Sequence, residues 1–197
     1  SYNAKSEAAI YNNSLFKVVT NNDIENDDKI TFNKLIIKTY NELHKKVYHI
    51  TDIKTTTLPA ESAKTTNENL ILKLIIPENS EVIFLGDFHS SIHSFIDIID
   101  DLKEKKKFNE NWELSENTYL VITGDMVDRG PYGIELLYLL YSLFIINNKD
   151  GYRFIILNGN HEEEDTYTDG GLGGEIKKQL NTNTTKLLKE ILRNLPV

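Results

Sequence analysis

Three short polar motifs contain most of the residues in this chain that could do chemistry together. They are Gly86–His89, Gly124–Gly130 and Gly159–Glu162, and each directly follows an apolar run of strand length. The motifs supply carboxylate oxygens, imidazole nitrogens and a guanidinium group, which are suited to holding metal ions beside a phosphate. Their recurrence predicts a metal-dependent site for phosphate ester hydrolysis.

Carboxylates and imidazole in the first two motifs suit metal binding. In an extended backbone Asp87 and His89 point the same way, so that one carboxylate and one imidazole can share a cation. Taken alone, such an Asp-x-His pattern is more typical of a loop acid and a surface histidine. Asp125 follows the second apolar run as Asp87 follows the first, which makes it the natural carboxylate to bridge two ions.

The other polar residues of the motifs suit substrate binding and proton transfer. Asn160 offers a neutral amide oxygen to a metal, and His161 beside a carboxylate is suited to protonate a leaving alkoxide. Asp128 and Arg129 precede a Gly-Pro turn, where they could instead cap the next helix and form a surface pair. Their convergence with two further motifs favours a role in the site.

Alternating strand and helix patterns must position these motifs. Apolar runs predict strands at 82–85, 119–123 and 154–157, with helices at 95–102 and 132–146 between them. This order indicates right-handed crossovers and an α/β fold with a mainly parallel sheet, in which ligands bind at the carboxyl ends of strands. All three motifs follow such ends, so we expect them to meet at one edge of the sheet.

The remaining segments are expected to cover or extend this core. We predict a loosely ordered N-terminal arm, an amphipathic helix, a surface loop or insertion, a run that forms a hairpin or adjacent strands with the first strand, a flexible glycine-rich loop and a final amphipathic helix. These segments are residues 1–29, 33–47, 51–69, 70–76, 170–174 and 186–195, in that order.

Composition excludes several classes of protein and of chemistry. The formal net charge of −8 argues against general binding of nucleic acid, which requires clustered Lys and Arg. The absence of cysteine excludes thiolate metal ligands and a thiol nucleophile. The longest apolar stretch, Leu136–Ile146, is shorter than the roughly 20 residues that cross a membrane, and we interpret it as a buried helix.

The compartment is suggested only by the absence of a signal pattern and by composition. Residues 1–7 show no charged-then-apolar signal pattern, so we expect a cytoplasmic protein. Richness in Asn, Ile and Lys is typical of AT-rich coding in some intracellular bacteria and large viruses. Secretion as an effector into a host cell therefore stays open as an alternative.

Together the motifs resemble those of the phosphoprotein phosphatase family of binuclear metallophosphoesterases. The family pattern is Gly-Asp-x-His, then Gly-Asp-x-Val-Asp-Arg-Gly, then Gly-Asn-His-Glu, and the chain contains all three in this order. The resemblance implies a metallophosphoesterase-like layered sheet with flanking helices and a βαβαβ core. It identifies residues 30–197 as the N-terminal portion of a catalytic domain that is incomplete on its C-terminal side.

The resemblance assigns the motif residues to a metal pair or to the reacting phosphate. It implies metal ligation by Asp87, His89, Asp125 and Asn160, with Asp125 as the bridge between the ions. It implies that His161 is the general acid, supported by Asp128, and that Arg129 holds phosphate oxygens. The cofactors would be two divalent metal ions, with Mn²⁺ expected and Fe or Zn as alternatives.

The function that this resemblance implies is hydrolysis of phosphate monoesters by a hydroxide that bridges the metal ions. We expect a phosphorylated protein as the partner, with phosphoserine or phosphothreonine favoured and phosphotyrosine not excluded. The sequence does not identify a regulatory partner. Two alternatives stay open, a dinucleoside polyphosphate hydrolase and a non-catalytic module that keeps the fold and binds metal.

Departures from the family pattern modify these expectations. The family uses two further histidines for its second metal, and no histidine follows His161, so we expect a fragment that holds this metal poorly, and its activity alone stays open. Ser90 replaces a usual glycine and Asn158 a usual arginine. The acidic run Glu162–Asp165 is interpreted as a solvated loop, with substrate selection as the alternative.

Overall fold

The computed structural model contains a strand–helix–strand–helix–strand core followed by a short 3₁₀ turn and two further helices. It describes residues 34–41, 74, 76–149, 151–163, 166 and 171–196. The elements are β1 (Glu81–Leu85), α4 (Ile92–Glu104), β2 (Thr118–Ile122), α5 (Gly133–Asn147), β3 (Phe154–Ile156), a 3₁₀ helix (Asn160–Glu162), α6 (Leu172–Gln179) and α7 (Thr182–Arg193). The predicted α/β order of the core is confirmed.

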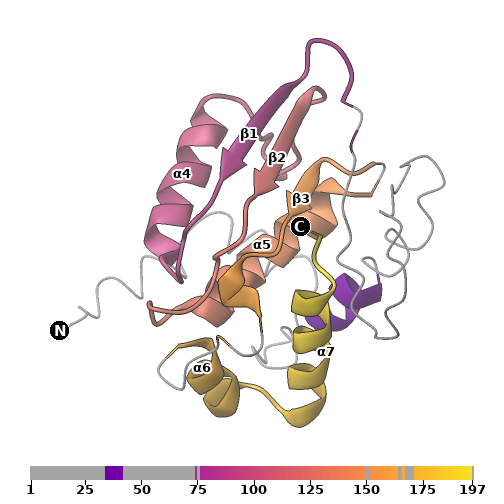
Figure 1. Cartoon of the computed structure of the whole chain (residues 1–197). Coiled ribbons are helices and arrows are strands. Elements are labelled where there is room, and N and C mark those ends of the chain that lie inside the picture. The colour runs from indigo at the N-terminus through magenta and orange to yellow at the C-terminus, as the bar shows by residue number, and fades with distance from the viewer. Residues whose placement is uncertain are drawn as a thin grey trace, which may run out of the picture.

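The three strands form one parallel sheet in the order β1-β2-β3. Their register aligns Leu85 with Ile122 and Ile122 with Ile156, so the carboxyl ends of the strands lie level. All three arrowheads point the same way in Figure 1. The segments that carry the three motifs therefore leave the sheet at the same edge, as the sequence predicts.

Two crossover helices supply a large share of the core that holds this sheet in place. In α4 the buried residues Ile92, Phe95, Ile99 and Leu102 recur at steps of three and four, which defines one apolar face. In α5 every residue of the segment 136–144 is buried, as expected for a helix that is apolar all round. The interpretation of this stretch as a buried helix is confirmed.

The glycine-rich segment behind the third motif begins a helix, so its prediction as a flexible loop is wrong for the described part. Helix α6 starts at Leu172, and both Leu172 and Ile176 are buried in the common core. Tertiary packing of these two side chains outweighs the weak helix propensity of the adjacent glycines. This helix approaches α5 and lies beyond the arrowheads of the strands in Figure 1.

Helix α7 begins at Thr182, earlier than the predicted start at residue 186. The side chain of Asn181 accepts a hydrogen bond of 2.9 Å from the backbone N–H of Thr184, which is a typical N-cap. Residues 34–41 of the predicted helix at 33–47 are helical. Leu74 and Ile76 lie outside any strand, and the rest of the run at 70–76, the arm at 1–29 and the loop at 51–69 fall outside the described residues.

Within the described part of the chain, no helix has the length and apolar character needed to cross a membrane.

Candidate active site

The first two motifs are joined by backbone hydrogen bonds beyond the ends of β1 and β2. The N–H of His89 donates to the carbonyl oxygen of Asp125 at 2.9 Å, and the N–H of Ser90 donates to that of Met126 at 2.8 Å. The N–H of Gly130 then donates back to the carbonyl oxygen of His89 at 3.1 Å. These bonds fix the two loops relative to each other.

The second and third motifs cross with their backbones in direct contact. Gly124 has a φ of +91°. A Cβ atom at this position would lie 2.4 Å from the backbone nitrogen of Gly159, and one on Gly159 would lie 2.3 Å from that of Asp125. Only residues without a side chain allow this approach. The glycines that open both motifs are thus required for the loops to meet.

The carboxyl group of Glu162 connects the same two loops. Its Oε2 accepts hydrogen bonds of 2.8 Å from the N–H groups of Asp125 and Gly159, and its Oε1 accepts one of 2.8 Å from Met126. Glu162 is fully buried, and this burial raises its pKa, although the backbone hydrogen bonds oppose the shift. The prediction of a solvated loop is therefore wrong for Glu162, whereas the next residue, Glu163, is exposed.

Three side chains converge as candidate metal ligands at the carboxyl ends of β1 and β2. Asp87, His89 and Asp125 each offer one ligand atom, and these atoms all lie within 4.8 Å of one another. The Nδ1 of His89 lies 3.2 Å from the carbonyl oxygen of Val127. Because a carbonyl can only accept, Nδ1 is the donor and Nε2 is left as a ligand with a free lone pair.

The amide of Asn160 faces the carboxylate of Asp125. One terminal atom of this amide lies 3.2 Å from Oδ1 and 3.3 Å from Oδ2 of Asp125. If the amide nitrogen faces the carboxylate, these contacts are hydrogen bonds. If the amide oxygen faces it instead, the oxygen atoms of Asn160 and Asp125 lie together as ligands do around a shared cation. The residues present thus fit a divalent metal ion that prefers oxygen and imidazole ligands.

His161 is placed between the metal-ligand candidates and the residues predicted to handle the phosphate. Its Nδ1 lies 3.2 Å from Oδ2 of Asp128, and its backbone N–H donates to Oδ1 of Asp125 at 3.1 Å. Nη2 of Arg129 lies 3.4 Å from its Nε2, and the rings of His161 and His89 are 4.8 Å apart, edge to face. The Asp128 side chain is 2% exposed and that of His161 is 19% exposed, so the pair opens outward through the imidazole.

Unusual backbone conformations accumulate at this site. Among the described residues, nine that are not glycine have positive φ. Six of these nine lie in the first two motifs or directly after the first motif. These six are Asp87, His89, Ser90, Asp125, Asp128 and Arg129. A residue held in this region costs on the order of 1–3 kcal/mol and persists where surrounding contacts enforce it, typically at functional sites.

The two departures from the family pattern each leave a buried polar atom. The hydroxyl of Ser90 and the Oδ1 of Asn158 are buried without a hydrogen-bond partner among the described residues. Ser90 has a φ of +62° and is 1% exposed, so it occupies a glycine-like conformation in a tight space. The backbone N–H of Asn158 donates to the carbonyl oxygen of Pro196 at 2.7 Å, which joins the segment after β3 to the segment after α7.

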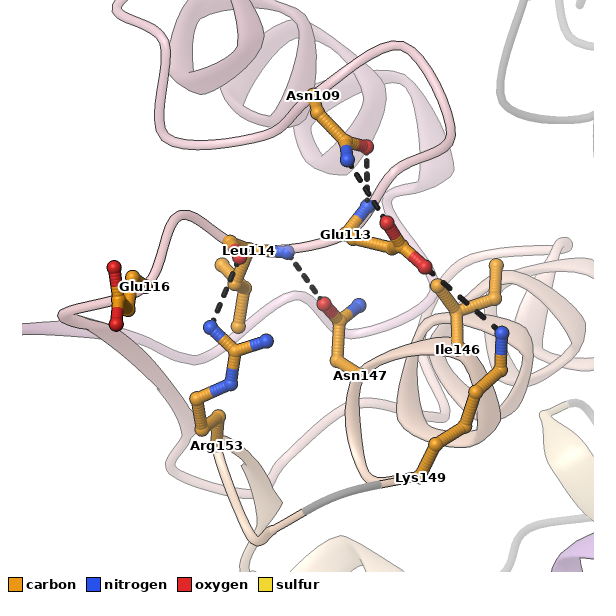
Figure 2. A pocket seen from close by; sticks show the side chains of 8 residues that line it. All are labelled: Asn109, Glu113, Leu114, Glu116, Ile146, Asn147, Lys149 and Arg153. Atoms are coloured by element: carbon orange, nitrogen blue, oxygen red, sulfur yellow. Dashed lines mark hydrogen bonds and ion pairs between the residues drawn. The ribbon is translucent and has the colours of Figure 1, made fainter.

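A separate pocket of about 500 Å³ lies at the opposite, amino ends of β2 and β3. Figure 2 shows that most of its polar side chains bind one another or nearby backbone, whereas no contact is drawn for Glu116. Oδ1 of Asn147 accepts from the N–H of Leu114 at 2.6 Å, Arg153 donates to the Leu114 carbonyl at 2.9 Å, and Lys149 pairs with Glu113 at 3.9 Å. The pocket contains none of the motif residues and is not part of the candidate active site.

Comparisons with known proteins match the segment that carries the three motifs. The family model of the calcineurin-like phosphoesterases matches residues 80–197, which includes all three motifs. Human serine/threonine-protein phosphatase 5 is 24% identical over 127 residues, which cover 64% of this chain and 23% of that protein. The Shewanella-like protein phosphatase 1 of Plasmodium berghei is 36% identical over 85 residues, which cover 43% of this chain and 23% of that protein.

Two further comparisons bear on substrate and on fold. A zinc-dependent endopolyphosphatase of Saccharomyces cerevisiae is 31% identical over 84 residues, which cover 43% of this chain and 21% of the enzyme. The solved structure of a protein serine/threonine phosphatase from Saccharomyces cerevisiae aligns with a TM-score of 0.59 at 17% identity. That alignment covers 98% of this chain and 50% of the yeast chain, so the present chain spans about half of its structural neighbour.

Proposed function

Because this chain belongs to the calcineurin-like phosphoesterase family, we propose that it takes part in metal-dependent hydrolysis of phosphate monoesters, with phosphoserine and phosphothreonine in proteins as the substrates. The observation that carries this proposal is the placement of His161, Asp128 and Arg129 directly beside the cluster of Asp87, His89 and Asp125. An acid, a phosphate clamp and metal ligands thereby face one small region.

The metal ligands proposed here are Asp87, His89, Asp125 and Asn160, with Asp125 shared between two ions. Asp125 suits this role because its carboxylate faces both the first-motif ligands and the amide of Asn160. Divalent metal ions supply Lewis-acid polarisation of the phosphoryl oxygens and an acidified water for attack on phosphorus. We propose Mn²⁺ as the metal, since carboxylate and amide oxygens make up most of this ligand set and suit it, with Fe or Zn as the alternatives that the imidazole of His89 would favour.

The remaining site residues bind and protonate the substrate. The guanidinium of Arg129 can hold two phosphate oxygens at once, which orients the ester for displacement. Asp128 accepts from Nδ1 of His161 and so directs Nε2 toward the region that Arg129 faces. Because a guanidinium can only donate, Nε2 is the acceptor in its contact with Arg129; once phosphate takes that bond and Nε2 carries a proton, this nitrogen is positioned to protonate the departing alkoxide.

Phosphorylated protein is favoured as the substrate because relatives along 64% of this chain are serine/threonine-protein phosphatases. A phosphoanhydride substrate is the competing candidate, since the yeast relative is an endopolyphosphatase. Both substrate types present phosphoryl oxygens to Arg129, from a terminal phosphate in the phosphoprotein and from a bridged phosphate in an internally cleaved anhydride. The choice therefore depends on surfaces around the site rather than on the motif residues.

A side-by-side assay of the full-length protein tests this proposal. Turnover of a phosphoserine peptide, a dinucleoside tetraphosphate and inorganic polyphosphate is measured with Mn²⁺ present and with the metal chelated. We expect Mn²⁺-dependent release of phosphate with the highest kcat/KM for the peptide. A clear preference for either anhydride would reject the protein substrate, and no turnover despite bound metal would indicate a non-catalytic module.

A further inference from the structure

Helices α5 and α6 both begin without a capping side chain of their own. The N-cap residues are Tyr132 for α5 and Gly171 for α6, and neither forms a side-chain hydrogen bond to its helix. The first backbone N–H groups of a helix have no partner within the helix and need an acceptor from elsewhere when they are buried. For each of these two helices, the acceptor is a side chain from the other helix or from the segment that precedes it.

Each helix start is capped by a carboxyl group from the other segment. Glu175, in the first turn of α6, accepts a hydrogen bond of 3.0 Å from the N–H of Ile134 in α5. In return, Oδ1 of Asp128, which precedes α5, accepts one of 2.8 Å from the N–H of Leu172 in α6. The segment from residue 128 to residue 134 is therefore attached to α6 at both of its ends.

The proposed phosphate clamp lies inside this doubly attached segment. Arg129 directly follows Asp128, and both residues have left-handed backbone conformations, with φ values of +62° and +67°. Such conformations need surrounding contacts to hold them. The second oxygen of Asp128, Oδ2, is the one that lies 3.2 Å from His161. The attachment to α6 thus fixes the backbone on both sides of Arg129.

We propose that Glu175 is a positioning residue for the reaction, because it holds the start of α5 and thereby the backbone that presents Arg129 to phosphate. This inference rests on the proposed function of the site and adds α6 to it as a structural support. Glu175 is itself partly enclosed, and this burial raises the pKa of its carboxyl group. An enclosed acid that caps a neighbouring helix has a structural task beyond the solvation of α6.

Phosphate affinity measured separately from metal affinity tests this inference. Inhibition by inorganic phosphate at saturating Mn²⁺, Mn²⁺ affinity and the folded fraction are compared for the full-length wild type and for Glu175→Ala. The control is Glu190→Ala, which removes an exposed acid from α7. We expect Glu175→Ala to weaken phosphate binding on the order of tenfold while Mn²⁺ affinity is kept, and the control to change neither.

Two further variants keep the test decisive. Glu175→Gln retains an oxygen that can accept from Ile134 and should restore most of the phosphate affinity, even if Glu175→Ala folds poorly. In an Arg129→Ala background, Glu175→Ala should add no further loss, because both changes would act through one group. Unchanged phosphate binding in a folded Glu175→Ala protein, or equal losses in both backgrounds, would overturn the inference. Failure of the wild type to hydrolyse any phosphoester would instead reject the proposed function.

Discussion

At the scale of single residues, His161 is the group whose surroundings constrain the proposed chemistry most. Its Nδ1 faces Asp128 at 3.2 Å, while its Nε2 faces Arg129 at 3.4 Å. The carboxylate behind the ring fixes the orientation of the imidazole, and a phosphate bound to Arg129 would meet the other ring nitrogen. This geometry suits a proton donor better than a metal ligand.

We therefore predict that His161→Asn lowers kcat without releasing metal. The asparagine keeps the backbone N–H that donates to Asp125 but cannot carry a proton to the leaving group, so the expected loss is about 10²–10⁴-fold. Turnover of an aryl phosphate and bound Mn²⁺ are measured on the same preparation. The matched control is His49→Asn, a histidine outside the motifs; equal activity of the His161 variant would remove this residue from its assigned role.

Residue types and spacing were sufficient to predict the convergence of Asp87, His89 and Asp125, because each follows a strand in a parallel sheet. The same reasoning missed Glu162 and Glu175. Their carboxyl groups accept hydrogen bonds from backbone N–H groups of other segments. Such contacts produce no periodic pattern of residues in the sequence. The place of Glu162 within the third motif was the one available signal that it is buried.

At the scale of elements, the loop between β1 and α4 carries a strained residue. Ser90 has a φ of +62° and a buried hydroxyl without a partner among the described residues. For a residue with a side chain, the left-handed conformation costs roughly 1–2 kcal/mol, and an unpaired buried hydroxyl adds to this cost. Ser90 is a departure from the family pattern that is visible in the sequence. The structure shows that this serine adopts a left-handed backbone conformation.

Replacing this residue with the family's glycine should stabilise the protein. We predict that Ser90→Gly raises the free energy of unfolding by about 1 kcal/mol, because relief of strain exceeds the extra entropy of glycine in the unfolded chain. Urea denaturation of the variant and of Ser94→Gly, an exposed serine within α4, measures the difference. The control should lose stability as glycine does in helices. A loss of stability in Ser90→Gly would show that this loop is not strained.

Elements with strong periodicity were predicted well, and the element that depends on tertiary contact was not. The β-branched runs and the helix faces of the βαβαβ core are visible in the sequence, and their order dictates parallel pairing. Helix α6 contains two glycines in its first turn and forms because Leu172 and Ile176 enter the core. Propensity alone therefore predicted a loop where packing forms a helix.

At the scale of the whole molecule, buried acids link stability to pH. Burial raises the pKa of Glu175 above its ordinary value of 4.5, and the nearby charge of Asp128 adds to the effect, while backbone N–H groups and Lys178 oppose it. The folded state then binds this proton more tightly than the unfolded state does. The contribution of Glu175 to stability is thus largest below pH 4.5 and declines as the pH rises through the raised pKa.

A comparison with Glu175→Gln isolates this contribution. We predict that the free energy of unfolding of the wild type, relative to the glutamine variant, falls as the pH rises from about 4 through the raised pKa of the acid. Urea denaturation across this range measures the two curves, with Glu190→Gln as an exposed control. Parallel curves for wild type and Glu175→Gln would show that the carboxyl group titrates normally in the folded protein.

The parallel register of the sheet brings three strand ends to one level, and the central proposal built on it is a site for divalent metal. The most direct test is Mn²⁺ titration of the full-length protein as wild type, as Asp125→Asn and as Asp97→Asn, which changes an exposed acid in α4. Loss of a group that only supports a ligand typically costs about 10–100-fold in metal affinity, so loss of Asp125 should cost about 100-fold or more. We expect tight binding in the wild type and the control and its loss in Asp125→Asn. Equal Mn²⁺ affinity in all three proteins would contradict the proposed metal site and the phosphoester chemistry that depends on it.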